Sequence, residues 1–277
     1  MLQTLLLNAA RDQLTALVGQ PREDSRPGDD ALARTGGWMD TYLTPSQIST
    51  LLTLAAHQQL SVRREGEWAM LLFQLAGRHS EVLEELCNKL SDAMATAPGP
   101  GSEAEYWKKT SVEYYDRYIK SGDSSVSRCL EVDNRVDLVG TFETLLNLAV
   151  FLEAAAAGRY REALQIIDAL GLYPQVADEV SPAAHQFSSL DGYIRRVADE
   201  TLLATVECAK ALFVQLRAET TGGTPGMARG VVTEREGEKA RLKERVNALV
   251  MFAGIVRSRL NKPNTAIVMA RIEDTMS

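Results

Sequence analysis

Apolar residues recur at helical spacing along most of the chain. Ile48, Leu52 and Ala55 fall on one face of a helix, and Leu86 and Leu90 continue the same spacing further on. A half-buried strand would need apolar and polar residues to alternate with period two, and no such run is sustained. The sequence also contains no Asn-Gly hairpin turn. The pattern therefore predicts an all-α fold.

The residues that begin helices are also readable. TPSQ at residues 44–47 places Thr and Gln three positions apart with Pro between them, which is a capping box. Ser102 with Glu105, and Thr233 with Glu236, repeat the spacing. Together with the apolar stripes, these signals predict helices at about residues 44–60, 65–76, 80–94, 102–122, 135–157, 160–170, 181–215 and 234–260, and a short one after residue 264.

One phrase occurs twice, at positions eighty-one residues apart. FQLAGRHSEVL at residues 73–83 and AAAAGRYREAL at residues 154–164 share an Ala-Gly-Arg core, with a Glu and a Leu at the same later positions. We expect Gly77 and Gly158 to adopt the left-handed conformation that ends one helix before an antiparallel one begins. The phrase therefore predicts helical hairpins stacked side by side, an irregular α-solenoid.

Pro- and Gly-rich stretches divide the chain. Residues 95–103, ATAPGPGSE, and residues 219–232, which include TTGGTPGMARG, are predicted loops. We expect residues 1–40 to form an N-terminal helix and a polar loop, and residues 41–277 to form the solenoid. No repeat at the 34-residue period of tetratricopeptide arrays is present, so the repeating unit is irregular.

Composition and charge exclude several classes of protein. With 277 residues, 45% of them hydrophobic, the chain can bury a continuous core. A net charge of −7 argues against a broad phosphate-binding surface, so we expect no direct nucleic-acid contact. The longest uncharged apolar run, residues 248–256, is far below the roughly 20 residues of a spanning helix, so no membrane span is expected. The N-terminus lacks the features of a signal peptide, which predicts an intracellular chain.

Residues that could carry chemistry are few. His57, His79 and His185 have no ligand-type neighbour at the i+3 or i+4 spacing of a helical metal site, and surface or capping roles are expected for them. No motif of a serine hydrolase, zinc protease or nucleotide-binding loop occurs. Cys87, Cys129 and Cys208 each lie among apolar neighbours in the sequence, as buried thiols do. We expect no catalytic residue, metal or cofactor. A partner-binding scaffold and a helical enzyme without a readable motif both remain open.

Two groups of large side chains are candidates for binding a partner. The aromatic cluster of residues 106–118 could form a peptide-binding surface or the packing face of a helix. The helices near residues 202–215 and 246–260 carry more large apolar residues than one neighbour can bury, so they either line a groove for a partner's helix or belong to the core. The groove candidates are Leu203, Leu212, Phe213, Leu249 and Phe252.

Several segments, in order, carry a resemblance to a known family. TFETLLNLAVFLEAAAAGRYREALQIIDALGLYP at residues 141–174, LLATVECAKALFVQLR at 202–217 and RVNALVMFAGIVRSRL at 245–260 resemble the ninety-three-kilodalton nucleoporin family, the nucleoporin-interacting-component family. LAGRHSEVLEELCNKLSDAM at residues 75–94 is similar to an earlier hairpin of that family. The resemblance spans most of residues 41–277 and is greatest after Gly140.

The resemblance implies a function as well as a fold. It implies the C-terminal part of the α-solenoid of a nuclear pore inner-ring scaffold, without catalysis, that binds other nucleoporins at the nuclear envelope and supports nucleocytoplasmic transport. The partner that it implies for this part is a short segment of the thirty-five-kilodalton linker nucleoporin. The alternatives are another intracellular helical-repeat adaptor and, less favoured, a helical enzyme.

Overall fold

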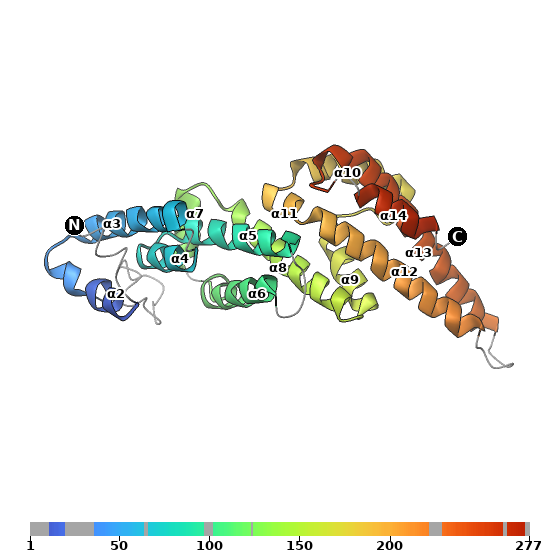
Figure 1. Cartoon of the computed structure of the whole chain (residues 1–277), viewed down its shortest axis with the longest axis horizontal. Coiled ribbons are helices and arrows are strands. Elements are labelled where there is room, and N and C mark those ends of the chain that lie inside the picture. Colours follow the sequence, from blue (N-terminus) through green and yellow to red (C-terminus); the bar gives the residue numbers. More distant parts are fainter. Residues whose placement is uncertain are drawn as a thin grey trace. The chain divides into compact units, whose positions relative to one another are not determined.

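The fold is all-α throughout the part of the chain that the structure describes. That structure, a computed structural model, describes residues 11–19, 36–63, 66–96, 102–122, 124–221, 229–262 and 265–274 (Figure 1). Within these ranges every regular element is a helix and no strand occurs, which confirms the predicted fold class. Successive helices are stacked in a contact pattern consistent with an α-solenoid.

The α-helices are α2 Arg11–Val18, α3 Pro45–Gln58, α4 Gly66–Leu75, α5 His79–Thr96, α6 Glu103–Tyr114, α7 Ser124–Val132, α8 Asp137–Ala156, α9 Tyr160–Leu170, α10 Val180–Ser189, α11 Gly192–Arg196, α12 Ala198–Thr221, α13 Arg229–Val256 and α14 Thr265–Asp274. Short 3-10 helices are η1 Trp38–Thr41, η4 Ala177–Glu179 and η5 Arg257–Arg259. Two π-helical turns, η2 Gln59–Arg63 and η3 Tyr115–Ile119, extend α3 and α6.

The predicted helix ends are confirmed where the sequence signals were most specific. Thr44 caps α3: the Gln47 amide donates to its side chain, and the Gln47 side chain accepts from the Thr44 backbone N–H at 2.9 Å. Gly77 and Gly158 have φ of +70° and +74°. Because only glycine adopts this region without strain, both residues act as the predicted helix terminators.

Four predicted boundaries are wrong. No helix was predicted between residues 122 and 135, but residues 124–132 form α7, which buries Val126 and Leu130, four positions apart. The helix predicted over residues 181–215 is divided into α10, α11 and α12. Thr233 does not begin a helix, because α13 already begins at Arg229. Helix therefore occupies residues 219–221 and 229–232 of the expected loop; most of the loop expected at residues 95–103 lies outside the described residues.

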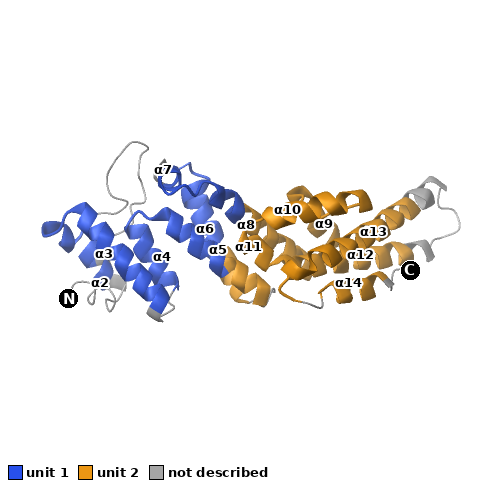
Figure 2. Cartoon of the chain, turned by 90° about the horizontal axis from the view of Figure 1, so that it is seen from above, with its two compact units in different colours: residues 1–89, 110–142 blue, residues 90–109, 143–277 orange. Residues whose placement is uncertain are grey.

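The contacts divide the chain into two compact units. Unit 1 comprises residues 1–89 and 110–142, and unit 2 comprises residues 90–109 and 143–277 (Figure 2). In unit 1, α3 packs on α4, and the Ser49 hydroxyl donates to the Ala76 carbonyl at 2.9 Å, beside the Gly77 turn. His79 Nδ1 lies 2.9 Å from the Tyr114 hydroxyl, and the Tyr114 ring meets Phe142 edge-on. Of the two roles considered for the aromatic cluster, Tyr114, 4% exposed, has the packing role.

Unit 2 is built around α12 and α13. α12 packs on α9, α13 and α14, and α13 packs on α10, α12 and α14. Because each helix has at least three neighbours, apolar residues are needed around most of its circumference. Phe252 lies at the centre of this core, fully buried, with edge-on contacts to the rings of Tyr173 at 5.8 Å and Phe187 at 5.6 Å.

Buried polar contacts join the helices of unit 2. Asp199, 3% exposed, accepts the backbone N–H of Asn261 at 2.7 Å and the hydroxyl of Thr265 at 2.5 Å, which holds the start of α14 against α12. Arg245 donates to both carboxylate oxygens of Asp168, at 2.5 and 3.1 Å, and so joins α13 to α9. The Arg245 side chain is only 11% exposed, and its pairing with Asp168 offsets the cost of removing its charge from water.

α8 is the one helix in the described ranges that is long and apolar enough, by length and composition alone, to cross a bilayer. Its residues Phe142, Leu145, Leu148 and Phe151 are fully buried within the protein, as those of a core helix are. The expectation that the chain has no membrane span stays a prediction.

Candidate functional site

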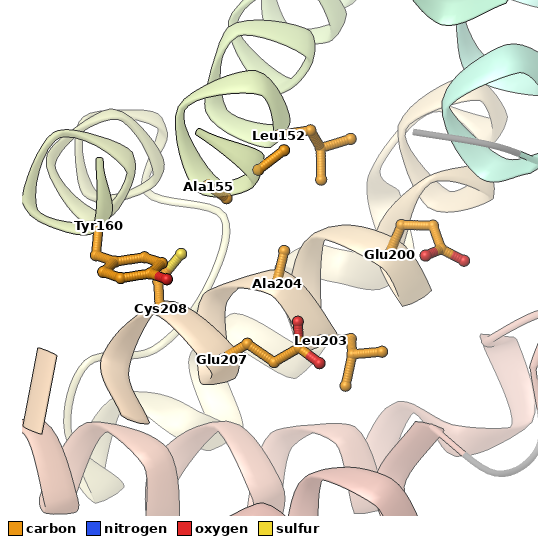
Figure 3. A pocket seen from close by; sticks show the side chains of 9 residues that line it. Leu152, Ala155, Tyr160, Glu200, Leu203, Ala204, Glu207 and Cys208 are labelled. Atoms are coloured by element: carbon orange, nitrogen blue, oxygen red, sulfur yellow. The ribbon is translucent and has the colours of Figure 1, made fainter. Parts of the chain in front are cut away.

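A pocket lies in unit 2 where α8, α9 and α12 meet. Its volume is about 280 Å³, enough for one large side chain. We call it the α12 pocket, because most of its lining comes from that helix (Figure 3). The residues that line it are Leu152, Ala155, Ala156, Tyr160, Glu200, Leu203, Ala204, Glu207 and Cys208.

Helical spacing and small side chains create the pocket. Glu200, Leu203, Ala204 and Glu207 are separated by three or four positions, so they share one face of α12. The C-terminal turn of α8 presents only alanine methyl groups, which leave the space open. The Gly158 turn then reverses the chain and brings Tyr160, the first residue of α9, to the wall. In Figure 3, Ala204 lies between Tyr160 on one side and Glu200 on the other.

The two carboxylates of the pocket differ in their partners. Glu200 forms an ion pair with Lys262. Glu207 is exposed and forms no ion pair with any described residue, and Lys210, one turn further along α12, does not reach it. Arg159, next to Tyr160 in the chain, is paired with Glu162, and Arg245, whose charge acts on Cys208, is paired with Asp168. The pocket therefore carries one uncompensated negative charge.

The Cys208 thiol is the other titratable group of the pocket. It is 2% exposed, and burial, with a smaller contribution from the Glu207 carboxylate, raises its pKa to about 11. At neutral pH the thiol is therefore protonated and a poor nucleophile. The described residues contain no group of His, Cys, Asp and Glu side chains placed to hold a metal ion.

The five residues predicted to line a partner groove are not brought together at one surface. Leu212 and Phe213 are 6% and 7% exposed, and Leu249 and Phe252 are fully buried. A partner could reach these four side chains only if the helices of unit 2 moved apart. Leu203 is half-buried and lines the α12 pocket. A role in partner binding stays a prediction for all five residues.

Sequence reasoning missed the rest of the pocket. Tyr160 and Ala156 were inside the repeated phrase but were given no role, and Glu207 was one acidic residue among many. The spacing of Glu200 and Glu207, seven residues apart on an α-helix, was the available signal, because it places both on one face. The alanine side chains that leave the space between the helices give no signal of their own.

Comparison with known proteins identifies the family. The profile of the Nup93/Nic96 family matches residues 1–265, almost the whole chain. The chain belongs to the Nup93/Nic96 family. The resemblance predicted over most of residues 41–277 is thereby confirmed, and it extends to the N-terminal region as well.

The family relatives are nuclear pore proteins. The chain is 30% identical to nuclear pore complex protein Nup93 of Danio rerio over 194 residues, and 28% and 27% identical to the proteins of the same name from Xenopus tropicalis and Xenopus laevis over 202 residues. These alignments cover 70–72% of this chain. The chain spans only 22–23% of the length of these relatives.

Proposed function

We propose that this chain is a structural component of the nuclear pore complex, part of an inner-ring scaffold at the nuclear envelope that supports nucleocytoplasmic transport. Membership of the Nup93/Nic96 family carries the proposal, because the relatives are named as nuclear pore complex proteins. The all-helical stack supports it, since such stacks present long surfaces on which other proteins bind. A non-catalytic role without cofactors is part of the proposal.

The partners that we propose are other nucleoporins, and in particular a short segment of the thirty-five-kilodalton linker nucleoporin. Leu203 is the predicted contact residue that such a segment could reach directly, because it is half-buried and lines the α12 pocket. The other predicted contact residues, Leu212, Phe213, Leu249 and Phe252, are buried, and the segment would reach them only if the helices of unit 2 moved apart. The site needs no direct nucleic-acid contact and no membrane span.

Binding of the linker nucleoporin tests the proposal. The full chain should bind a labelled linker segment in a fluorescence anisotropy titration, and Leu203→Lys should weaken that binding at least about tenfold by placing a charge on an apolar contact. Val214→Lys is the matched control, since Val214 is on the same helix, 53% exposed and outside the pocket. Equal affinities of the two variants would contradict the contact, and no binding of the unmodified chain would contradict the choice of partner.

Localisation tests the scaffold itself. A fluorescently labelled chain added to Xenopus egg extract should concentrate at the rim of the nuclei assembled there. Uniform staining, with the linker segment bound normally in the titration, would contradict a place in the pore and leave only an adaptor role.

A further inference from the structure

We propose that the α12 pocket takes the side chain of a lysine or arginine from a bound partner segment. The aliphatic stem lies on Ala155, Leu203 and Ala204, and the cationic head meets the Glu207 carboxylate. The proposal rests on the proposed function, because it names the chemistry by which a partner nucleoporin is recognised at this site.

The lining suits a side chain that is apolar along its length and charged at its end. Leu152, Ala155 and Ala204 supply aliphatic contact, and their short or buried side chains leave room for an unbranched stem. Lysine and arginine bury such stems along apolar surface while the charged head stays at the rim. A volume of about 280 Å³ accommodates either side chain.

The charge of the pocket selects against a purely apolar occupant. A leucine or phenylalanine would cover the apolar wall and displace water from the Glu207 carboxylate. The carboxylate would then lose solvation without gaining an opposite charge. No cation of the described residues satisfies it: Lys262 is held by Glu200, and Arg159 by Glu162. An incoming ammonium or guanidinium group would supply the missing opposite charge.

Short peptides can test this without any natural partner. The probes are Ac-Ala-Leu-Xaa-Leu-Ala-amide with Xaa as lysine, arginine or norleucine, titrated into the full chain labelled on its alanine and leucine methyl groups for NMR. Norleucine has the lysine stem without the charge. We expect the lysine and arginine peptides to shift the methyl signals of Ala155, Ala204 and Leu203, with affinity at least about threefold above that of the norleucine peptide.

Two matched pairs of variants locate the interaction. Glu207→Gln should bring the lysine peptide down to the affinity of the norleucine peptide, whereas Glu244→Gln, an exposed carboxylate on α13 outside the pocket, should not. Ala156→Phe should block the pocket, whereas Ala157→Phe, the exposed neighbour that does not line it, should leave binding unchanged. All four positions are exposed, so each variant is expected to fold, and the melting temperature checks that it does.

Three results would overturn the proposal. One is equal or tighter binding of the norleucine peptide, which would make the site apolar. Another is unchanged lysine binding in Glu207→Gln, and the third is no pocket-centred shift with any peptide at 10 mM, on the order of the weakest interactions that such spectra detect. Each of these results is compatible with normal binding of the linker segment, so failure of this proposal is distinguishable from failure of the proposed function.

Discussion

Individual glycines decide where hairpins turn. Gly158 has φ of +74° between α8 and α9, and an added Cβ would meet only the Tyr160 side chain, at 3.9 Å. The cost of a substitution therefore comes from the backbone conformation. We expect Gly158→Val to destabilise the protein by about 1–2 kcal/mol, because a β-branched residue is strained in the left-handed region. The midpoint of urea unfolding, followed by circular dichroism, measures this change.

Gly140 is the matched control for Gly158. It lies within α8, it has no positive φ, and a Cβ there would enter open space. Gly140→Ala should therefore raise stability by about 0.5–1 kcal/mol through the better helix propensity of alanine. Loss of stability in Gly140→Ala, or none in Gly158→Val, would contradict the roles given to these two residues.

The Cys208 thiol should be unreactive in the folded protein. A pKa near 11 instead of the ordinary 9.0 leaves about a hundredfold less thiolate at pH 8. Alkylation of Cys208 by iodoacetamide, quantified by mass spectrometry, should be at least that much slower in the native chain than in urea. Glu207→Gln should speed it by removing a nearby negative charge.

The raised pKa of the Cys208 thiol should also make the stability of the protein depend on pH at high pH. Above about pH 9 the unfolded chain loses the Cys208 proton while the folded chain keeps it, so the stability that this group provides should fall as the pH rises towards 11. Cys208→Ala should flatten that part of the pH profile. Native alkylation as fast as in urea would show that the thiol is neither buried nor raised in pKa.

At the scale of elements, a partly buried ion pair between Asp168 and Arg245 joins α9 to α13. The Arg245 side chain is 11% exposed and that of Asp168 33%. Removing one partner leaves the other charge without compensation, so Asp168→Ala should cost about 2–3 kcal/mol. Replacing both, as Asp168→Leu with Arg245→Met, should cost less than the single change, about 1 kcal/mol or below.

Thermal melts of Asp168→Leu, Arg245→Met and the double variant, each against the unmodified chain, measure the coupling of the two side chains. A cost of the double variant equal to the sum of the two single costs would mean that the side chains act independently, which contradicts the pairing. Glu238→Gln serves as the control on the same helix, because its ion pair with Arg161 is at the surface, where such pairs contribute little.

The elements themselves could largely be predicted from sequence, and the exceptions have physical reasons. Capping residues and glycine turns act locally, so the helix ends at Thr44, Gly77 and Gly158 could be predicted from the sequence. α7 was missed because its few apolar residues, Val126 and Leu130 among them, are separated by polar ones. The start of α13 was placed too late because capping boxes are short motifs, and Thr233 with Glu236 also fits the interior of a helix.

The site was less predictable, because it depends on which helices meet. We expected α13 to carry more large apolar side chains, Leu249 and Phe252 among them, than one neighbouring helix could bury. In unit 2, however, α13 packs on at least three other helices. The number of neighbours is set by long-range packing and leaves no local pattern. The α12 pocket likewise exists because alanines on α8 and α12 do not fill the space between the helices. The sequence does not distinguish an alanine that faces a pocket from one that faces a neighbouring helix.

At the scale of the whole molecule, stability should be distributed by unit. In stacked helices each element contacts mainly its neighbours, so damage in one place need not unfold the rest.

Phe252 is fully buried at the centre of unit 2, and Phe252→Ala should cost about 3–5 kcal/mol by leaving a cavity between the Tyr173 and Phe187 rings. We expect amide hydrogen exchange to accelerate in α10, α12, α13 and α14 while α3 and α4 in unit 1 keep their protection. Ala240→Ser, at an exposed position of α13, is the control and should change neither. Uniform acceleration along the whole chain would show that the two units unfold as one.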